Sequence, residues 1–133
     1  MSRELDEQCA RALGYWVYHY DKDHANNCYY QLLDQDLSPV ELLSYRAELR
    51  KTETEAWADA PNFSSDSCAA SILEDEIERR GLQSKYTTAL VQIVAPETEK
   101  VTSHLYYADD DDFWSLIRAT PEQRARAFLE AIK

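Results

Sequence analysis

The stretch at residues 62–94 constrains the fold of this chain more than any other part of its sequence. Ser64, Ser65 and Asp66 precede an amphipathic pattern, and their side-chain oxygens can accept hydrogen bonds from the free N–H groups at a helix start. Gly81 follows the pattern, and glycine readily takes the left-handed conformation that ends many helices. We therefore predict a helix from about Ser65 to Gly81, with one apolar face against the rest of the domain.

The residues after this helix favour strands. Residues 86–94 are rich in β-branched and aromatic side chains, are mostly apolar at both alternating sets of positions, and are followed by Pro96. This pattern predicts a central strand covered on both sides. A polar turn leads to a second candidate strand at 101–107, so we expect a hairpin of the two, and we predict a last strand at 113–118.

The first third of the chain predicts a short helix and a hairpin. An apolar stripe from Leu5 to Leu13 indicates the helix, and Gly14 indicates its end. Residues 15–20 then favour a strand that returns, after a polar turn, as a second strand at 28–33.

Two later stretches carry the sequence signal of a helix start. Ser38 and Pro39 are followed by Glu41 at the capping-box position, which predicts a helix to about Lys51. The same signal at residues 120–123, with a threonine cap, a proline and a glutamine, predicts the final helix.

These elements predict an α+β fold in which helices cover a mostly antiparallel β-sheet on both faces, giving α/β/α layers. A length of 133 residues suits one domain, residues 1–133, and we expect residues 34–60 to form a helical insertion in it. The sequence has no apolar run near the roughly 18 residues of a membrane span.

The charge of the chain narrows its possible partners. Fourteen Lys and Arg stand against 25 Asp and Glu, for a formal net charge of −11, which repels the phosphate backbone of nucleic acids. General nucleic-acid binding is therefore disfavoured. The acidity fits three other uses: solubility, binding of a cation or a basic protein, and mimicry of nucleic acid.

The cysteines and the N-terminal residues indicate a cellular compartment. Cys9, Cys28 and Cys68 are odd in number, far apart, and lack the close pairs of zinc or redox motifs, so we expect reduced thiols. The first residues lack the apolar core of a signal peptide. We expect a soluble cytoplasmic protein.

Three segments resemble the phage ABA sandwich domain family, small proteins of bacterial viruses and prophages with an α/β/α layering. They are the N-terminal helix that runs through residues 12–14 into Tyr15-Trp16, the phenylalanine, serine and aspartate of residues 61–66 before the Ala69-Ala70 helix, and the closing Ala119-Thr120-Pro121-Glu122. The resemblance implies a phage or prophage origin and action inside a bacterial host cell. It also implies an anti-defence role, because comparable small phage proteins act against host defence, some by sequestering nucleotide-derived immune signals in oligomeric pockets.

The candidate ligand-binding residues are three arginines near the predicted last strand and last helix: Arg118, Arg124 and Arg126. Guanidinium groups bind phosphate in a fork, and a helix N-terminus offers further N–H donors. A base would stack on an aromatic side chain, for which we take Trp16 first and Tyr86 or Trp114 as alternatives. The competing interpretation is that the arginines of the helix pair with Glu122 and Glu130 on a solvated face.

An alternative function is that of an acidic protein inhibitor. Carboxylates on the central helix and in the aspartate run would imitate nucleic-acid phosphates toward a host defence effector such as a CRISPR or restriction nuclease. The candidate partner-binding residues are Glu74, Asp75, Glu78, Asp110 and Asp111. The competing interpretation is a solvated surface.

The sequence gives little support for a metal site or for catalysis. His19, His24 and Cys28 could surround one hairpin, but zinc sites usually need a fourth ligand. The aspartate run at 109–112 lacks the glycine and final glutamate of a calcium loop, and the chain shows no nucleophile–base pair and no Gly-rich phosphate loop. We expect no enzyme, no cofactor and no metal. Nine Tyr and three Trp make us expect a homo-oligomer, because such residues favour interfaces.

Overall fold

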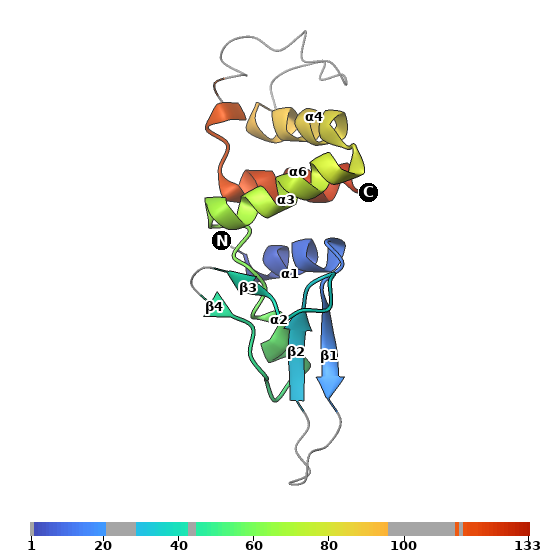
Figure 1. The fold of residues 1–133 in the computed structure, drawn as a ribbon. Coiled ribbons are helices and arrows are strands. Elements are labelled where there is room, and N and C mark those ends of the chain that lie inside the picture. Colours follow the sequence, from blue (N-terminus) through green and yellow to red (C-terminus); the bar gives the residue numbers. More distant parts are fainter. Residues whose placement is uncertain (1, 21–28, 43–44, 96–113, 115) are drawn as a thin grey trace. The chain divides into compact units, whose positions relative to one another are not determined.

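A computed structural model describes residues 2–20, 29–42, 45–95, 114 and 116–133 of the chain (Figure 1). The described residues form a mostly helical α+β protein with five helices, one two-stranded antiparallel sheet and a shorter two-stranded ladder. They do not form the predicted α/β/α sandwich, because neither sheet has more than two strands. They fall into two compact units, which we call the hairpin unit, Asp6–Pro61, and the helical unit, Met1–Leu5 with Asn62–Lys133.

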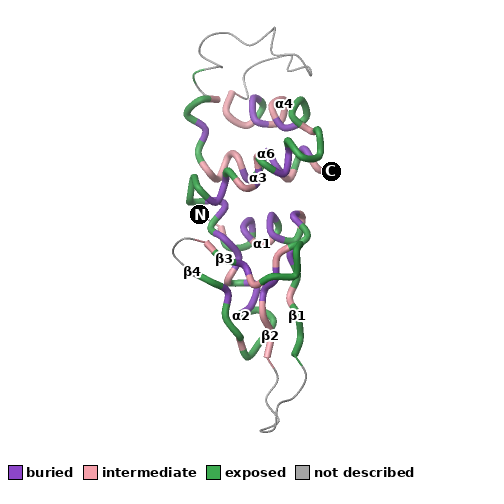
Figure 2. Tube along the Cα trace, viewed as in Figure 1, coloured by how far each residue is buried: buried purple, intermediate pink, exposed green. Residues whose placement is uncertain are grey.

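The predicted first helix and hairpin are confirmed. Helix α1, Arg3–Ala12, is followed by Gly14, whose φ of 92° lies in the left-handed region where glycine is favoured. Strand β1, Trp16–Tyr20, pairs antiparallel with β2, Tyr29–Leu33, in one register along its whole length. The apolar side chains at the α1 end of β2 are buried (Figure 2).

The helix predicted from Ser38 to Lys51 is wrong, because this segment pairs with β2 through its backbone. Val40 donates to the carbonyl of Leu32 at 3.2 Å and accepts from Ala47 at 2.7 Å. Ser38 serves a turn rather than a helix cap, and its N–H donates to the side chain of Asp34 at 3.2 Å. Backbone pairing with residues outside the predicted helix has overridden the local signal.

The remainder of residues 34–60 holds two short strands and one short helix instead of a helical insertion. Strand β3, Glu41–Leu42, pairs with β4, Tyr45–Arg46. Helix α2, Glu53–Trp57, starts at the N-cap Thr52, whose hydroxyl accepts from the Glu55 N–H at 3.1 Å. Its Ala56 and Trp57 are buried, and α2 packs on β2.

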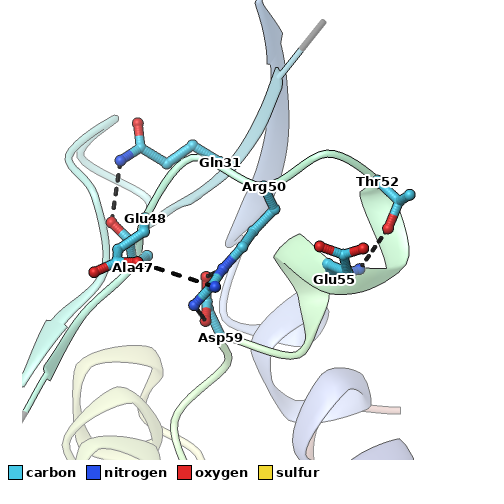
Figure 3. Close-up of polar contacts among 7 residues, drawn as sticks. All are labelled: Gln31, Ala47, Glu48, Arg50, Thr52, Glu55 and Asp59. Carbon is cyan, nitrogen blue, oxygen red and sulfur yellow. Dashed lines mark hydrogen bonds and ion pairs between the residues drawn. The ribbon is translucent and has the colours of Figure 1, made fainter.

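Arg50 connects β2 to the residues that follow α2 through hydrogen bonds (Figure 3). Its backbone exchanges two hydrogen bonds with Tyr30, at 2.8 and 2.7 Å. Its guanidinium donates twice to the carboxylate of Asp59, from Nε at 2.9 Å and from Nη2 at 2.7 Å. A bidentate pair of this kind is stronger than a single hydrogen bond, and the Asp59 side chain is only 11% exposed.

We predict that Asp59→Asn lowers the free energy of unfolding by about 1–2 kcal/mol, because charge-assisted hydrogen bonds are lost. The effect stays moderate because the Arg50 side chain is partly exposed to water. Urea denaturation measures the change. Glu48→Gln is the matched control, because the Glu48 carboxylate is 74% exposed and lies 4.0 Å from Arg50 Nη1. Equal effects of the two substitutions would show that the Asp59 pair has no special role.

The predicted central helix is confirmed. Helix α3, Ser67–Arg80, has Asp66 as its N-cap, and the Asp66 carboxylate accepts from the Cys68 N–H at 2.9 Å. At the other end Gly81 is left-handed with φ 70°, and the Leu82 N–H donates to the carbonyl of Ile77 at 3.0 Å. This is the Schellman arrangement that glycine after a helix predicts.

The strand predicted at 86–94 is wrong, because these residues belong to helix α4, Gln83–Val94. Tyr86, Leu90 and Val91 are buried, and their spacing puts them on one face of a helix. The hydroxyl of Thr87 donates to the Gln83 carbonyl at 2.8 Å, one turn earlier in the helix. The apolar residues at both alternating sets of positions therefore belong to a helix that packs on a second helix, α6, Pro121–Ala131.

Helix α6, Pro121–Ala131, has the predicted capping box. Thr120 accepts from the Gln123 N–H at 3.1 Å, and the Gln123 side chain accepts from the Thr120 N–H at 2.9 Å. Figure 1 shows α6 beside α3 and α4, and it packs against both through buried residues that include Phe128.

Of the other predicted strands, 101–107 lies outside the described residues. The strand predicted at 113–118 is wrong where it is described, because residues 114, 116 and 117 are helical. Among the described helices, none is long and apolar enough to cross a membrane.

Candidate functional site

Two of the three candidate arginines lie on α6, and the third precedes it. Arg118 comes two residues before the N-cap Thr120, and Arg124 and Arg126 lie on the first turns of the helix. The N-terminus of α6 offers fewer free donors than the sequence suggested, because the capping box takes up the Gln123 N–H and residue 121 is a proline. Binding of phosphate near this helix end would therefore depend on the arginine side chains.

Arg124 belongs to a polar contact between α3, α4 and α6. Its Nη1 lies 3.9 Å from Glu74 Oε1, and the hydroxyl of Tyr86 donates to the other oxygen of Glu74 at 2.6 Å. Burial, and secondarily the hydrogen bond to Glu74, raise the pKa of the Tyr86 hydroxyl well above its usual range. Tyr86 is 8% exposed, so its ring is part of the core and offers no face for a base.

Arg126 forms an exposed pair with Glu122, one turn earlier on α6. Its Nη2 donates to Glu122 Oε1 at 3.0 Å, and both side chains are at least 40% exposed. The guanidinium holds the pKa of Glu122 below its usual value. Exposed pairs of this kind contribute little to stability, so Arg126 can exchange this partner for another anion at low cost.

Arg118 lies over an exposed tryptophan one turn earlier in the chain. Its Cζ is 5.8 Å from the centroid of the Trp114 ring, and Trp114 is 60% exposed. The Arg118 N–H donates to the Trp114 carbonyl at 3.1 Å, which sets this i, i+4 spacing. Within the described part of the chain, no carboxylate lies within ion-pair distance of Arg118. Both residues were candidates, but their contact was not predicted, because this segment was predicted as a strand, in which residues 114 and 118 would not be neighbours.

Trp16 belongs to the hairpin unit, where it begins an aromatic row on one face of β1. Trp16, Tyr18 and Tyr20 are 38%, 42% and 37% exposed. Neighbouring rings meet edge to face, with centroids 5.5 Å apart for Trp16 and Tyr18 and 4.7 Å apart for Tyr18 and Tyr20. The alternation of these side chains in the sequence is the signal for such a row, because alternate strand residues share a face.

The acidic residues of α3 have different surroundings. Glu74 is bound by Tyr86 and Arg124, whereas Asp75 and Glu78 are exposed. Asp110 and Asp111 lie outside the described residues. The alternative function, an acidic protein inhibitor, therefore stays a prediction that rests on the negative charge of the chain.

The structure adds no metal site in the part of the chain that it describes. No group of three His, Cys, Asp or Glu side chains there is suited to hold a metal ion. His19 stacks on Tyr30, with centroids 4.6 Å apart and planes at 7°, while His24 and Cys28 lie outside the described residues. Burial raises the pKa of the Cys9 thiol to about 12, so Cys9 is suited to packing rather than to nucleophilic chemistry.

We compared the chain with known proteins at three levels. No family model, no curated protein and no solved structure matches it. The resemblance to the phage ABA sandwich domain family therefore stays a prediction.

Proposed function

We propose that this protein is a non-enzymatic binding protein that sequesters a small nucleotide-derived signal. The observation that carries the proposal is the exposed Trp114 ring with the Arg118 guanidinium beside it. A nucleotide combines a flat aromatic base with anionic phosphate, and this pair offers a stacking face and a cation in one place. A protein of net charge −11 needs such a local cation to bind a small anion.

Arg126 is the second phosphate-binding group of the proposed site. It lies at the middle of α6, eight residues after Arg118 in the chain, and its exposed partner Glu122 holds it weakly. Arg124 supports the site instead, because it joins Glu74 and Tyr86 in the contact between helices. Trp114 replaces Trp16 as the stacking residue in this proposal, since it lies in the same helical turn as Arg118.

The biological setting follows the resemblance stated above. A phage or prophage protein that sequesters a nucleotide signal would disarm host defence in the bacterial cytoplasm. The proposed ligands are therefore cyclic di- and trinucleotides and cyclic ADP-ribose isomers. No chemical step is needed for this role, since retention of the signal is sufficient.

Native mass spectrometry with a panel of these nucleotides tests the proposal. We expect one nucleotide to be retained at fixed stoichiometry, and Arg118→Ala to weaken its affinity roughly 10- to 100-fold, which corresponds to the loss of one charge-assisted hydrogen bond. Titration calorimetry measures the change in affinity.

Arg46→Ala is the matched control, because Arg46 is an exposed arginine of the hairpin unit and its removal changes the net charge equally. It should leave the affinity within twofold. Absence of any retained nucleotide, or equal weakening by the two substitutions, would refute the proposed site.

A further inference from the structure

The outer edge of β1 is open in the part of the chain that the structure describes. On one side β1 pairs with β2 over five residues, and no other described strand pairs with it. Natural proteins usually protect such an edge with proline, with lysine or other charges, or with a bulge. The β1 sequence WVYHY has no proline and no charged lysine, arginine or carboxylate, so it lacks these protections.

The two strands of the hairpin are also uncharged, on a strongly acidic chain. Neither WVYHY nor YYQLL contains Asp, Glu, Lys or Arg, while the chain carries −11. Two copies of this protein repel one another, and a region without carboxylates is where they can approach at least cost. A basic partner protein would gain nothing from this region, so charge favours a second copy here.

The aromatic row is held in place and faces solvent. The hydroxyl of Tyr20 donates to Gln31 Oε1 at 2.9 Å, and the Gln31 amide donates to the Ala47 carbonyl at 3.1 Å. The edge-to-face contacts fix Tyr18 between Trp16 and Tyr20. An ordered aromatic surface loses little side-chain entropy on binding, and aromatic residues are enriched at interfaces.

We propose that two copies of the chain associate through their β1 edges, in antiparallel pairing about a two-fold axis at Tyr18. The odd length of β1 makes this register self-complementary, because Tyr18 then lies opposite its own copy and Trp16 lies opposite the second copy's Tyr20. The two hairpins become a four-stranded sheet with eight aromatic side chains on one face, those of Trp16, Tyr18, Tyr20 and Tyr29 of each copy. The interface is small, so the dissociation constant should be on the order of 10 μM.

Salt gives this association a distinctive signature. Raising the ionic strength from 0.1 to 1 M shortens the screening length from about 10 Å to about 3 Å, which weakens the repulsion between two acidic chains. The dimer should therefore become tighter with salt. Binding of the acidic surface to a basic protein would weaken instead.

Sedimentation equilibrium of the full chain at 0.1 and 1 M NaCl tests the proposal. We expect a monomer–dimer equilibrium that strengthens with salt and is abolished by Tyr18→Lys, which puts two like charges opposite one another. Leu49→Lys is the control, because Leu49 is an exposed apolar residue off the hairpin and gains the same charge. It should retain the dimer. A monomer at both salt concentrations, or a dimer that survives Tyr18→Lys, would overturn the proposal.

A cross-linking measurement keeps the test decisive if Tyr18→Lys disturbs folding. With Cys28 and Cys68 changed to serine, Tyr18→Cys should form a disulfide-linked dimer on mild oxidation, because directly opposed residues have Cβ atoms about 4.5–5.5 Å apart. Leu49→Cys in the same background should not form that dimer. Failure of Tyr18→Cys to cross-link above the Leu49→Cys level would also overturn the proposed register.

Discussion

Phe128→Ala should lower the free energy of unfolding of the helical unit by about 3–5 kcal/mol, as truncation of a buried phenylalanine usually does. The Phe128 side chain is fully buried on α6, the helix that packs against α3 and α4. Removal of the ring loses apolar burial and leaves a cavity that helices packed on two sides cannot readily close. Urea denaturation followed by circular dichroism at a helix-sensitive wavelength measures the change.

Two further substitutions calibrate that result. Phe128→Leu keeps most of the buried volume and should cost less than about 1.5 kcal/mol. Ile117→Ala removes an apolar side chain that is 70% exposed, and it should change the free energy of unfolding by less than about 0.5 kcal/mol. If Phe128→Ala cost no more than Ile117→Ala, the packing of α6 described above would be wrong.

Acid should selectively weaken the helical unit through Glu76, a residue of α3. The Glu76 side chain is 7% exposed and accepts from Arg79 Nη2 at 2.7 Å and from Arg80 Nε at 2.7 Å. These hydrogen bonds, that of Arg79 first, lower the pKa of Glu76 from 4.5 to about 2 against the opposing effect of burial.

The sign of the pH dependence follows from this lowered pKa. In the unfolded chain Glu76 takes up a proton near pH 4.5, whereas in the folded chain it does so only near pH 2. Its contribution to stability is therefore complete above pH 4.5 and is lost as the pH falls from 4.5 toward 2, with an upper limit of about 3 kcal/mol. Between those values one extra proton binds to the unfolded chain, so the free energy of unfolding falls by about 1.4 kcal/mol per pH unit on account of this group.

Glu76→Gln isolates that contribution. The variant should be less stable than the natural chain at pH 7, and the difference should shrink as the pH falls through 4 to 3, since the amide does not titrate. Urea denaturation at pH 7, 5, 4 and 3 measures both curves. Glu78→Gln, an exposed carboxylate on the same helix, should give a curve nearly parallel to that of the natural chain. A constant difference between Glu76→Gln and the natural chain at all four pH values would contradict the assigned pKa.

Cap signals predicted the ends of α3 and α6 correctly, whereas contacts outside the local segment decided the elements that were predicted wrongly. Thr120 caps a helix as predicted, and Asp66, one of three candidate caps, caps α3, because a cap depends on the next three residues. Residues 86–94 have the composition of a strand but pack as a helix, since burial against α6 outweighs β-propensity. Ser38 and Pro39 imitate a helix start, but the backbone there is paired with β2.

The candidate site divides in the same way. The Arg126–Glu122 pair follows from a four-residue spacing on a correctly predicted helix. The contact of Arg124 with Glu74 joins residues on two helices fifty positions apart, and no pattern in the sequence indicates it. The Trp114–Arg118 pair needed the helical turn that the predicted strand excluded.

The helical unit consists of two separate segments of the chain, one before and one after the hairpin unit in the sequence. Within the helical unit, Arg3 Nη1 donates to Asn62 Oδ1 at 2.6 Å, and the Ser2 N–H donates to Ser64 Oγ at 3.3 Å. These contacts close a loop of 59 residues, which in a flexible chain costs roughly 3–4 kcal/mol of entropy by the (3/2)RT ln n relation. A hairpin unit that is already folded removes most of that cost, because its own structure restricts the loop. On the ribosome, where residues 6–61 emerge before the rest of the helical unit, synthesis itself therefore favours folding of the hairpin unit first.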